Sequence, residues 1–157
     1  MVSYNHTQIG YLMLGVTLAV LALFAWIYTT AWAEAPSVDS GPNLAVCGVM
    51  VLVLLILASF ATLTVSIDEN YIRIKFGYGI FQKKLPLQEV ASVKQVKNYW
   101  YYGWGIRLWL WPTMWIFNVS GFDAVEVILK NRKIYRIGTN EPAELSAEIK
   151  RAASISI

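Results

Sequence analysis

Residues 9–33 read IGYLMLGVTLAVLALFAWIYTTAWA, and residues 44–65 read LAVCGVMVLVLLILASFATLTV, without a charged side chain in either stretch. A run of about 20 apolar residues crosses a bilayer core of roughly 30 Å. Both stretches reach that length. The sequence therefore predicts a transmembrane helical hairpin over residues 1–63, with spans at about 9–33 and 44–63.

The charge distribution predicts how this hairpin is oriented. All 13 Lys and Arg residues lie at or beyond Arg73, whereas the first 72 residues carry only four acidic side chains, Glu34, Asp39, Asp68 and Glu69. Cytoplasmic flanks of membrane helices are enriched in Lys and Arg. We therefore expect the loop at 34–43 to be extracytoplasmic, with the N-terminus and the C-terminal half in the cytoplasm.

A cleaved signal peptide is the alternative interpretation of the first span, because Ala31-Trp32-Ala33 resembles a cleavage site. The preceding residues lack positive charge, however, and the apolar run exceeds the roughly 7–15 residues usual for a signal peptide. Retention of the span as a membrane helix is therefore favoured. The single cysteine, Cys47, allows no disulfide within one chain.

From residue 64 onward the pattern changes from continuous to alternating hydrophobicity. Alternation predicts strands at 64–68, 71–76 and 90–96, an irregular strand at 81–87, and a hairpin of 125–129 with 133–137. A helix should follow, with Asn140 as its cap and Pro142 in its first turn. Its apolar stripe is Leu145, Ile149 and Ala152. The fold class is therefore α+β, with residues 64–157 forming a cytoplasmic domain.

This order of elements behind two membrane spans resembles the bacterial pleckstrin-homology-like domain family. The residues that carry the resemblance are IDENYIRI at 67–74, KLPLQEV at 84–90, YGWGIR at 102–107, SGFDAVEV at 120–127 and IGTNEP at 137–142. The resemblance covers residues 64–152. It implies a bent antiparallel sheet of about seven strands with a C-terminal helix over it and a tendency to self-associate. Together with the predicted spans and orientation, we expect a protein of the bacterial cytoplasmic membrane. The resemblance implies no particular activity.

The segment at 98–117, NYWYYGWGIRLWLWPTMWIF, is the richest in aromatic residues. It contains five of the seven tryptophans, namely Trp100, Trp104, Trp109, Trp111 and Trp115. Burial of all five indole N–H groups requires five hydrogen-bond partners in a domain of fewer than 100 residues. Besides core packing, two interpretations stay open: contact with the membrane interface and contact with another subunit.

Four basic residues around the second predicted turn are candidates for binding anionic lipid headgroups: Arg73, Lys75, Lys83 and Lys84. The alternative is that they only solubilise a strand face or protect a sheet edge. Residues 64–157 hold all 13 basic but only eight of the ten acidic residues. A basic domain beside a membrane points first to anionic lipids, and no motif for nucleic acid is visible.

Residues suited to catalysis are nearly absent from the sequence. The only histidine, His6, precedes the first span, and the sequence shows neither a metal-ligand cluster nor a Gly-rich phosphate loop. We therefore expect no enzyme, no cofactor and no metal. The favoured function is a membrane-anchored module that assembles with itself or organises a membrane protein complex. The alternatives are an anionic lipid headgroup-binding module and an accessory subunit of a membrane enzyme or transporter.

Overall fold

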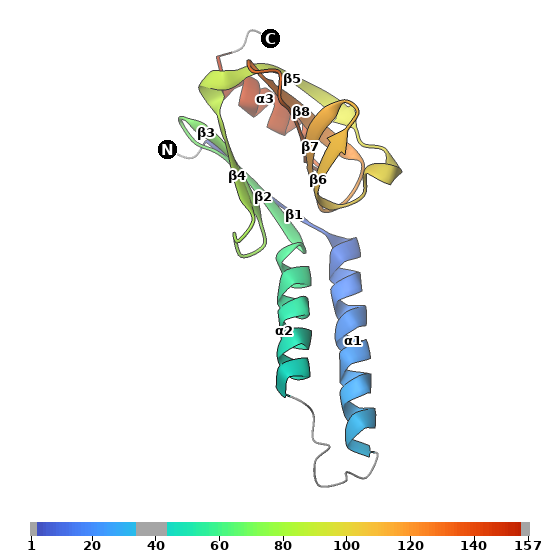
Figure 1. The fold of residues 1–157 in the computed structure, drawn as a ribbon. Coiled ribbons are helices and arrows are strands. Elements are labelled where there is room, and N and C mark those ends of the chain that lie inside the picture. Colours follow the sequence, from blue (N-terminus) through green and yellow to red (C-terminus); the bar gives the residue numbers. More distant parts are fainter. Residues whose placement is uncertain (1–2, 34–43, 155–157) are drawn as a thin grey trace.

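The computed structural model describes residues 3–33 and 44–154 (Figure 1). The protein is α+β, with two β-sheets and a C-terminal helix. Helices α1 (Tyr11–Ala33) and α2 (Leu44–Ser59) lie side by side and project from the β domain. By length and composition, one helix among the described residues can cross a membrane, at Tyr11–Thr30. The expected loop at 34–43 lies outside the described residues.

The first sheet has four antiparallel strands in the order β1 (Tyr4–Ile9), β2 (Thr62–Ile67), β3 (Tyr71–Phe76) and β4 (Gln82–Pro86). The alternation predicted at 71–76 is confirmed, since Ile72, Ile74 and Phe76 are fully buried while the residues between them are exposed. Period-two burial fixes which side of this sheet faces the core.

Strand β1 was not predicted from the sequence. It pairs with β2 from Tyr4 opposite Ile67 to Ile9 opposite Thr62, so a part of residues 1–63 belongs to the β domain. The second apolar helix also ends at Ser59 rather than near residue 63, because Thr62 already begins β2. That predicted boundary was wrong by four residues.

The second sheet has five strands: β5 (Val90–Lys97), β6 (Gly105–Leu110), β7 (Thr113–Asn118), β8 (Asp123–Leu129) and β9 (Ile134–Gly138). Their spatial order is β5-β8-β9-β7-β6, and all neighbours are antiparallel except the parallel pair β7–β9. Short 3-10 turns lie at Leu87–Glu89 and Trp100–Tyr102. Residues 3–33 and 44–154 thus form nine strands in two sheets, because the N-terminus adds β1 and the aromatic segment forms its own β6–β7 hairpin.

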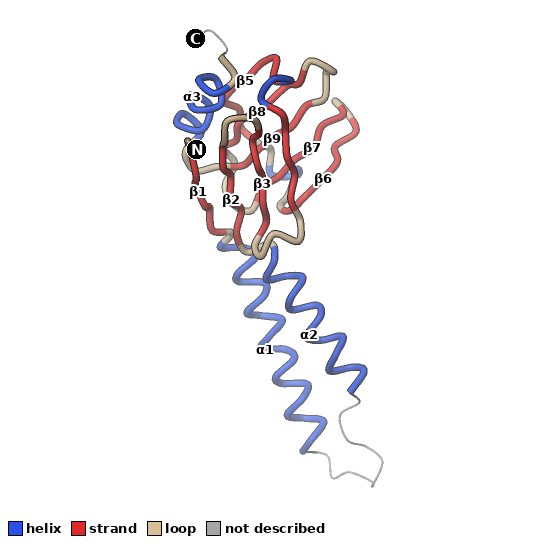
Figure 2. Tube along the Cα trace, turned by 90° about the vertical axis from the view of Figure 1, so that its left-hand side faces the viewer, coloured by secondary structure: helices blue, strands red, loops and turns tan. Residues whose placement is uncertain are grey.

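The two sheets face each other across one hydrophobic core, and helix α3 (Pro142–Ala152) covers one open side of it (Figure 2). Leu145 and Ile149 of α3 are fully buried, which confirms the apolar stripe predicted for this helix. Helix α3 contacts β5, β8 and β2. The other open side lies between edge strands β4 and β6.

Both N-terminal helices continue directly into paired strands. Gly10 alone separates β1 from α1, and its N–H donates a 2.7 Å hydrogen bond to the Ala61 carbonyl, just before β2. On the far side of β2, the Gly77 N–H donates to the Thr62 carbonyl at 3.0 Å. Because only one or two residues intervene at each junction, the helix pair and the first sheet form one connected unit.

Candidate functional site

The four predicted basic residues do not form one cluster. In the β3–β4 ladder Arg73 lies opposite Lys84, Lys75 opposite Gln82 and Lys83 opposite Ile74. Opposed residues share a face of a sheet, and Ile74 is fully buried in the core. Lys83 therefore extends from the inner side of β4, whereas the other three lie on the outer side.

Arg73 is further committed to an ion pair. Its Nη2 lies 2.6 Å from Oδ2 of Asp68, and its Nε donates to the same oxygen at 2.7 Å. The second carboxylate oxygen, Oδ1, accepts the backbone N–H groups of Asn70 and Tyr71 at 2.9 and 2.8 Å. These bonds, with that from Asn70 the largest cause, hold the pKa of Asp68 below its ordinary value. Arg73 therefore stabilises the β2–β3 turn.

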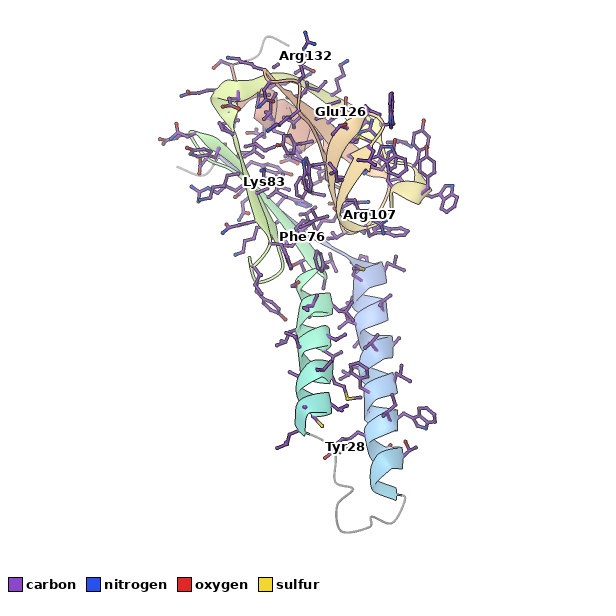
Figure 3. The ribbon with its side chains drawn as sticks, in the orientation of Figure 1. Tyr28, Phe76, Lys83, Arg107, Glu126 and Arg132 are labelled. Carbon is purple, nitrogen blue, oxygen red and sulfur yellow. The ribbon has the colours of Figure 1, made fainter. Side chains whose placement is uncertain are left out.

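Lys83 lies at a cleft of about 250 Å³ between the two sheets. The walls are mainly apolar and include Phe76 and Phe81 from the first sheet and its turn, and Ile106, Trp115 and Phe117 from the β6–β7 hairpin. In Figure 3, Lys83 and Phe76 mark the first-sheet side of this opening. The Lys83 ammonium lies 5.9 Å from the centroid of the Tyr135 ring, close enough for a cation–π contact.

The five predicted tryptophans do not share one environment. Trp104 borders a groove shared with Met13 of α1, at the helix end of the domain. Trp115 lines the cleft. Trp109 packs on the outer side of the second sheet, with its ring centroid 4.8 Å from that of Tyr102 and its Nε1 donating to the Trp111 carbonyl at 2.8 Å.

The remaining two predicted tryptophans, Trp100 and Trp111, are strongly exposed, at 74% and 90%. Trp111 lies at the tip of the β6–β7 hairpin, whose other end is near Gly105 and Phe60. At about 3.3 Å per residue, six residues of β6 place this tip some 20 Å along the strand from that end. Trp104 and Trp111 therefore do not belong to one surface.

Sequence reasoning missed a group of apolar residues in the β3–β4 turn. Tyr78 and Ile80 are 66% and 72% exposed, and the Phe81 ring stacks on Phe60 with centroids 5.0 Å apart. Phe60 directly follows α2, and Figures 1 and 2 show the turn beside the ends of the helices. The available signal was the composition of residues 77–81, GYGIF, since turns at a water-facing site are ordinarily polar.

Within the described residues, no group of three or more His, Cys, Asp or Glu side chains is placed to hold a metal ion. His6 contacts the start of α3 instead, with its Nε2 2.7 Å from Oδ1 of Asn140 and its Nδ1 3.1 Å from Oε2 of Glu141. This arrangement joins β1 to α3.

Comparisons of the chain with protein-family models, with curated proteins and with solved structures found no match.

Proposed function

We propose that this protein is a non-enzymatic module with a pleckstrin-homology-like fold, anchored in the bacterial cytoplasmic membrane, that assembles with copies of itself at the cytoplasmic face. The exposed tip and free edge of the β6–β7 hairpin carry this proposal. Strand β6 pairs only with β7 among the described strands. Its Leu108 and Leu110 are exposed, and Trp111 follows them at the hairpin tip.

A free strand edge with exposed apolar side chains is a template for pairing with another chain. Aromatic residues are also enriched in the centres of protein interfaces. An antiparallel pair of β6 strands related by a two-fold axis matches each copy with the same surface of the other. A second copy of this chain is therefore the occupant that we propose for this edge.

The anchor in this proposal is the helix pair α1 and α2, with the β domain on the side where every Lys and Arg of the sequence lies. Among the helices of the described residues, α1 alone has the length of a span. Helix α2 is uncharged and apolar, but its 16 residues extend only about 24 Å. The pairing of α1 with α2 and the direct continuation of both into the first sheet support a shared membrane environment.

The pleckstrin-homology-like part of the proposal is supported by two facing sheets with a C-terminal helix over one open side. Headgroup recognition by Arg73, Lys75, Lys83 and Lys84 is supported less, because Arg73 pairs with Asp68 and Lys83 lies on the opposite side of the sheet. Assembly is therefore the function that we favour.

Native mass spectrometry of the full chain in a mild detergent tests assembly. We expect an oligomer for the wild type and a monomer for the double variant Leu110→Lys, Trp111→Ser, because each copy then brings an unpaired charge into the apolar paired edge and loses the exposed indole beside it. Trp100→Ser is the matched control, since Trp100 is similarly exposed but lies outside β6; it should leave the mass unchanged. A strictly monomeric wild type would contradict the proposal.

A further inference from the structure

The cleft between the two sheets has features that self-assembly through β6 does not use. Its walls are apolar, and they are contributed by the inner sides of the β3–β4 and β6–β7 hairpins. Pockets for drug-sized ligands typically enclose about 300–1,000 Å³. A volume of about 250 Å³ lies just below this range and suits one narrow apolar chain.

One charged side chain, Lys83, lines this cleft among the described residues. No carboxylate forms an ion pair with Lys83 in the described part of the chain; the acids that do pair are joined to other partners. An apolar cleft with one unneutralised cation at its rim is complementary to an apolar chain ending in one negative charge.

The cleft opens at the helix end of the domain. Ile80 and Phe81 line it, and the Phe81 ring stacks on Phe60, the first residue after α2. With α1 and α2 in a bilayer, as the proposed function requires, this opening lies at the cytoplasmic surface of the membrane. A ligand can then enter laterally from the lipid leaflet without crossing bulk water.

We propose that this cleft binds a single fatty carboxylate taken from the cytoplasmic leaflet. The acyl chain lies along the wall that Phe76, Phe117 and Trp115 form, and the Lys83 ammonium pairs with the carboxylate. Lys84 and Lys75 take no part, because their register places them on the outer side of the sheet. The inference rests on the proposed membrane anchor, but it does not depend on β6 pairing.

Photo-cross-linking of the full chain in nanodiscs of phosphatidylcholine tests this site. The probe is a palmitic acid analogue with a diazirine in its chain, and mass spectrometry locates the cross-linked peptides. We expect saturable labelling of peptides that contain Phe81 or Trp115. Unlabelled palmitate should compete for this labelling at least about tenfold better than hexadecanol, which lacks the charge that a charge-assisted hydrogen bond needs.

Three variants distinguish labelling by a probe bound in the cleft from labelling by general contact with lipid. Lys83→Gln should weaken saturable labelling roughly tenfold, because it removes the charged partner. Ile106→Trp should abolish the labelling by filling the cleft. Lys84→Gln, which removes an equal charge from the outer side, should leave it unchanged.

Labelling confined to α1 and α2, labelling that does not saturate, or equal losses in Lys83→Gln and Lys84→Gln would overturn the proposal. The proposal also fails if Lys83→Gln lowers the oligomeric mass while the wild type shows no saturable labelling. The cleft would then bind a segment of another protein copy instead of a fatty carboxylate. Normal labelling in a monomeric wild type would refute only self-assembly and leave the fatty carboxylate site standing.

Discussion

Gly77 shows how strongly a single position constrains the junction between helix and sheet. Its φ is +42°, and a Cβ there would overlap the backbone carbonyl of Ser59 at the end of α2. A left-handed conformation alone costs a non-glycine residue about 1–2 kcal/mol. We expect Gly77→Ala to lower the free energy of unfolding by more than this conformational cost, because the overlap with Ser59 adds to it. Thermal or denaturant unfolding in detergent measures the difference.

Gly121→Ala is the matched control for this prediction. Gly121 has a φ of +72°, but nothing lies within 4 Å of an added Cβ. The free energy of unfolding that Gly121→Ala loses should therefore reflect the unfavourable backbone conformation alone. A loss for Gly77→Ala no greater than that for Gly121→Ala would show that Ser59 does not press against this position.

Asp68 predicts a dependence of stability on pH. Because the pKa of its carboxyl is lowered in the folded protein, its contribution is complete above the ordinary aspartate pKa of about 3.9. The contribution is lost as the pH falls below that value through the folded pKa. We expect the wild type to lose more thermal stability than Asp68→Asn between about pH 5 and pH 2. Parallel melting curves over that range would contradict this role.

At the residue scale, the sequence showed which side chains are charged or polar, but not which residues they contact. Arg73 lies opposite Lys84 in the β3–β4 ladder, but the ion pair between Arg73 and Asp68 depends on a turn geometry that charge patterns do not contain. Asn140 was expected to cap α3, and this was wrong. Its side chain contacts His6, and α3 begins after Glu141 without a side-chain cap.

At the element scale, the tryptophans of the β6–β7 hairpin are of two kinds, packed and exposed. Trp109 is half-buried against Tyr101 and Tyr102, whereas Trp111 is almost fully exposed. We expect Trp109→Ala to cost about 2 kcal/mol, roughly half the loss for a fully buried tryptophan. Trp111→Ala should change stability by no more than about 0.5 kcal/mol. Denaturant unfolding of the two variants compares them directly, and equal losses would contradict this division.

The elements with strong periodicity were predicted, and those that depend on distant pairing were not. Alternation located β3, and the apolar stripe of Leu145 and Ile149 located α3. Strand β1 is largely polar, and it is ordered by its ladder with β2, more than 50 residues away in the sequence. The parallel pairing of β7 with β9 is similarly non-local. The local sequence pattern carries no information on the β1–β2 pairing or on the β7–β9 pairing.

At the scale of the whole molecule, the proposed orientation is testable by chemical labelling. In a Cys47→Ser background, Ser40→Cys should react with a membrane-impermeant maleimide in intact spheroplasts, because residues 34–43 are predicted to be extracytoplasmic. Ala147→Cys, on an exposed position of α3, should react only after lysis. The reverse pattern would place the β domain outside the cytoplasm.

The short junctions at Gly10 and at residues 60–61 couple the orientation of the helices to that of the β domain. Helix α1 is about 34 Å long and α2 about 24 Å, from their 23 and 16 residues. A bilayer that matches one of these lengths is mismatched to the other, and helices respond to mismatch by tilting. Since β1 and β2 continue the helices almost without a break, we expect that with both helices in a bilayer, as proposed, a change in bilayer thickness rotates the whole β domain relative to the membrane plane.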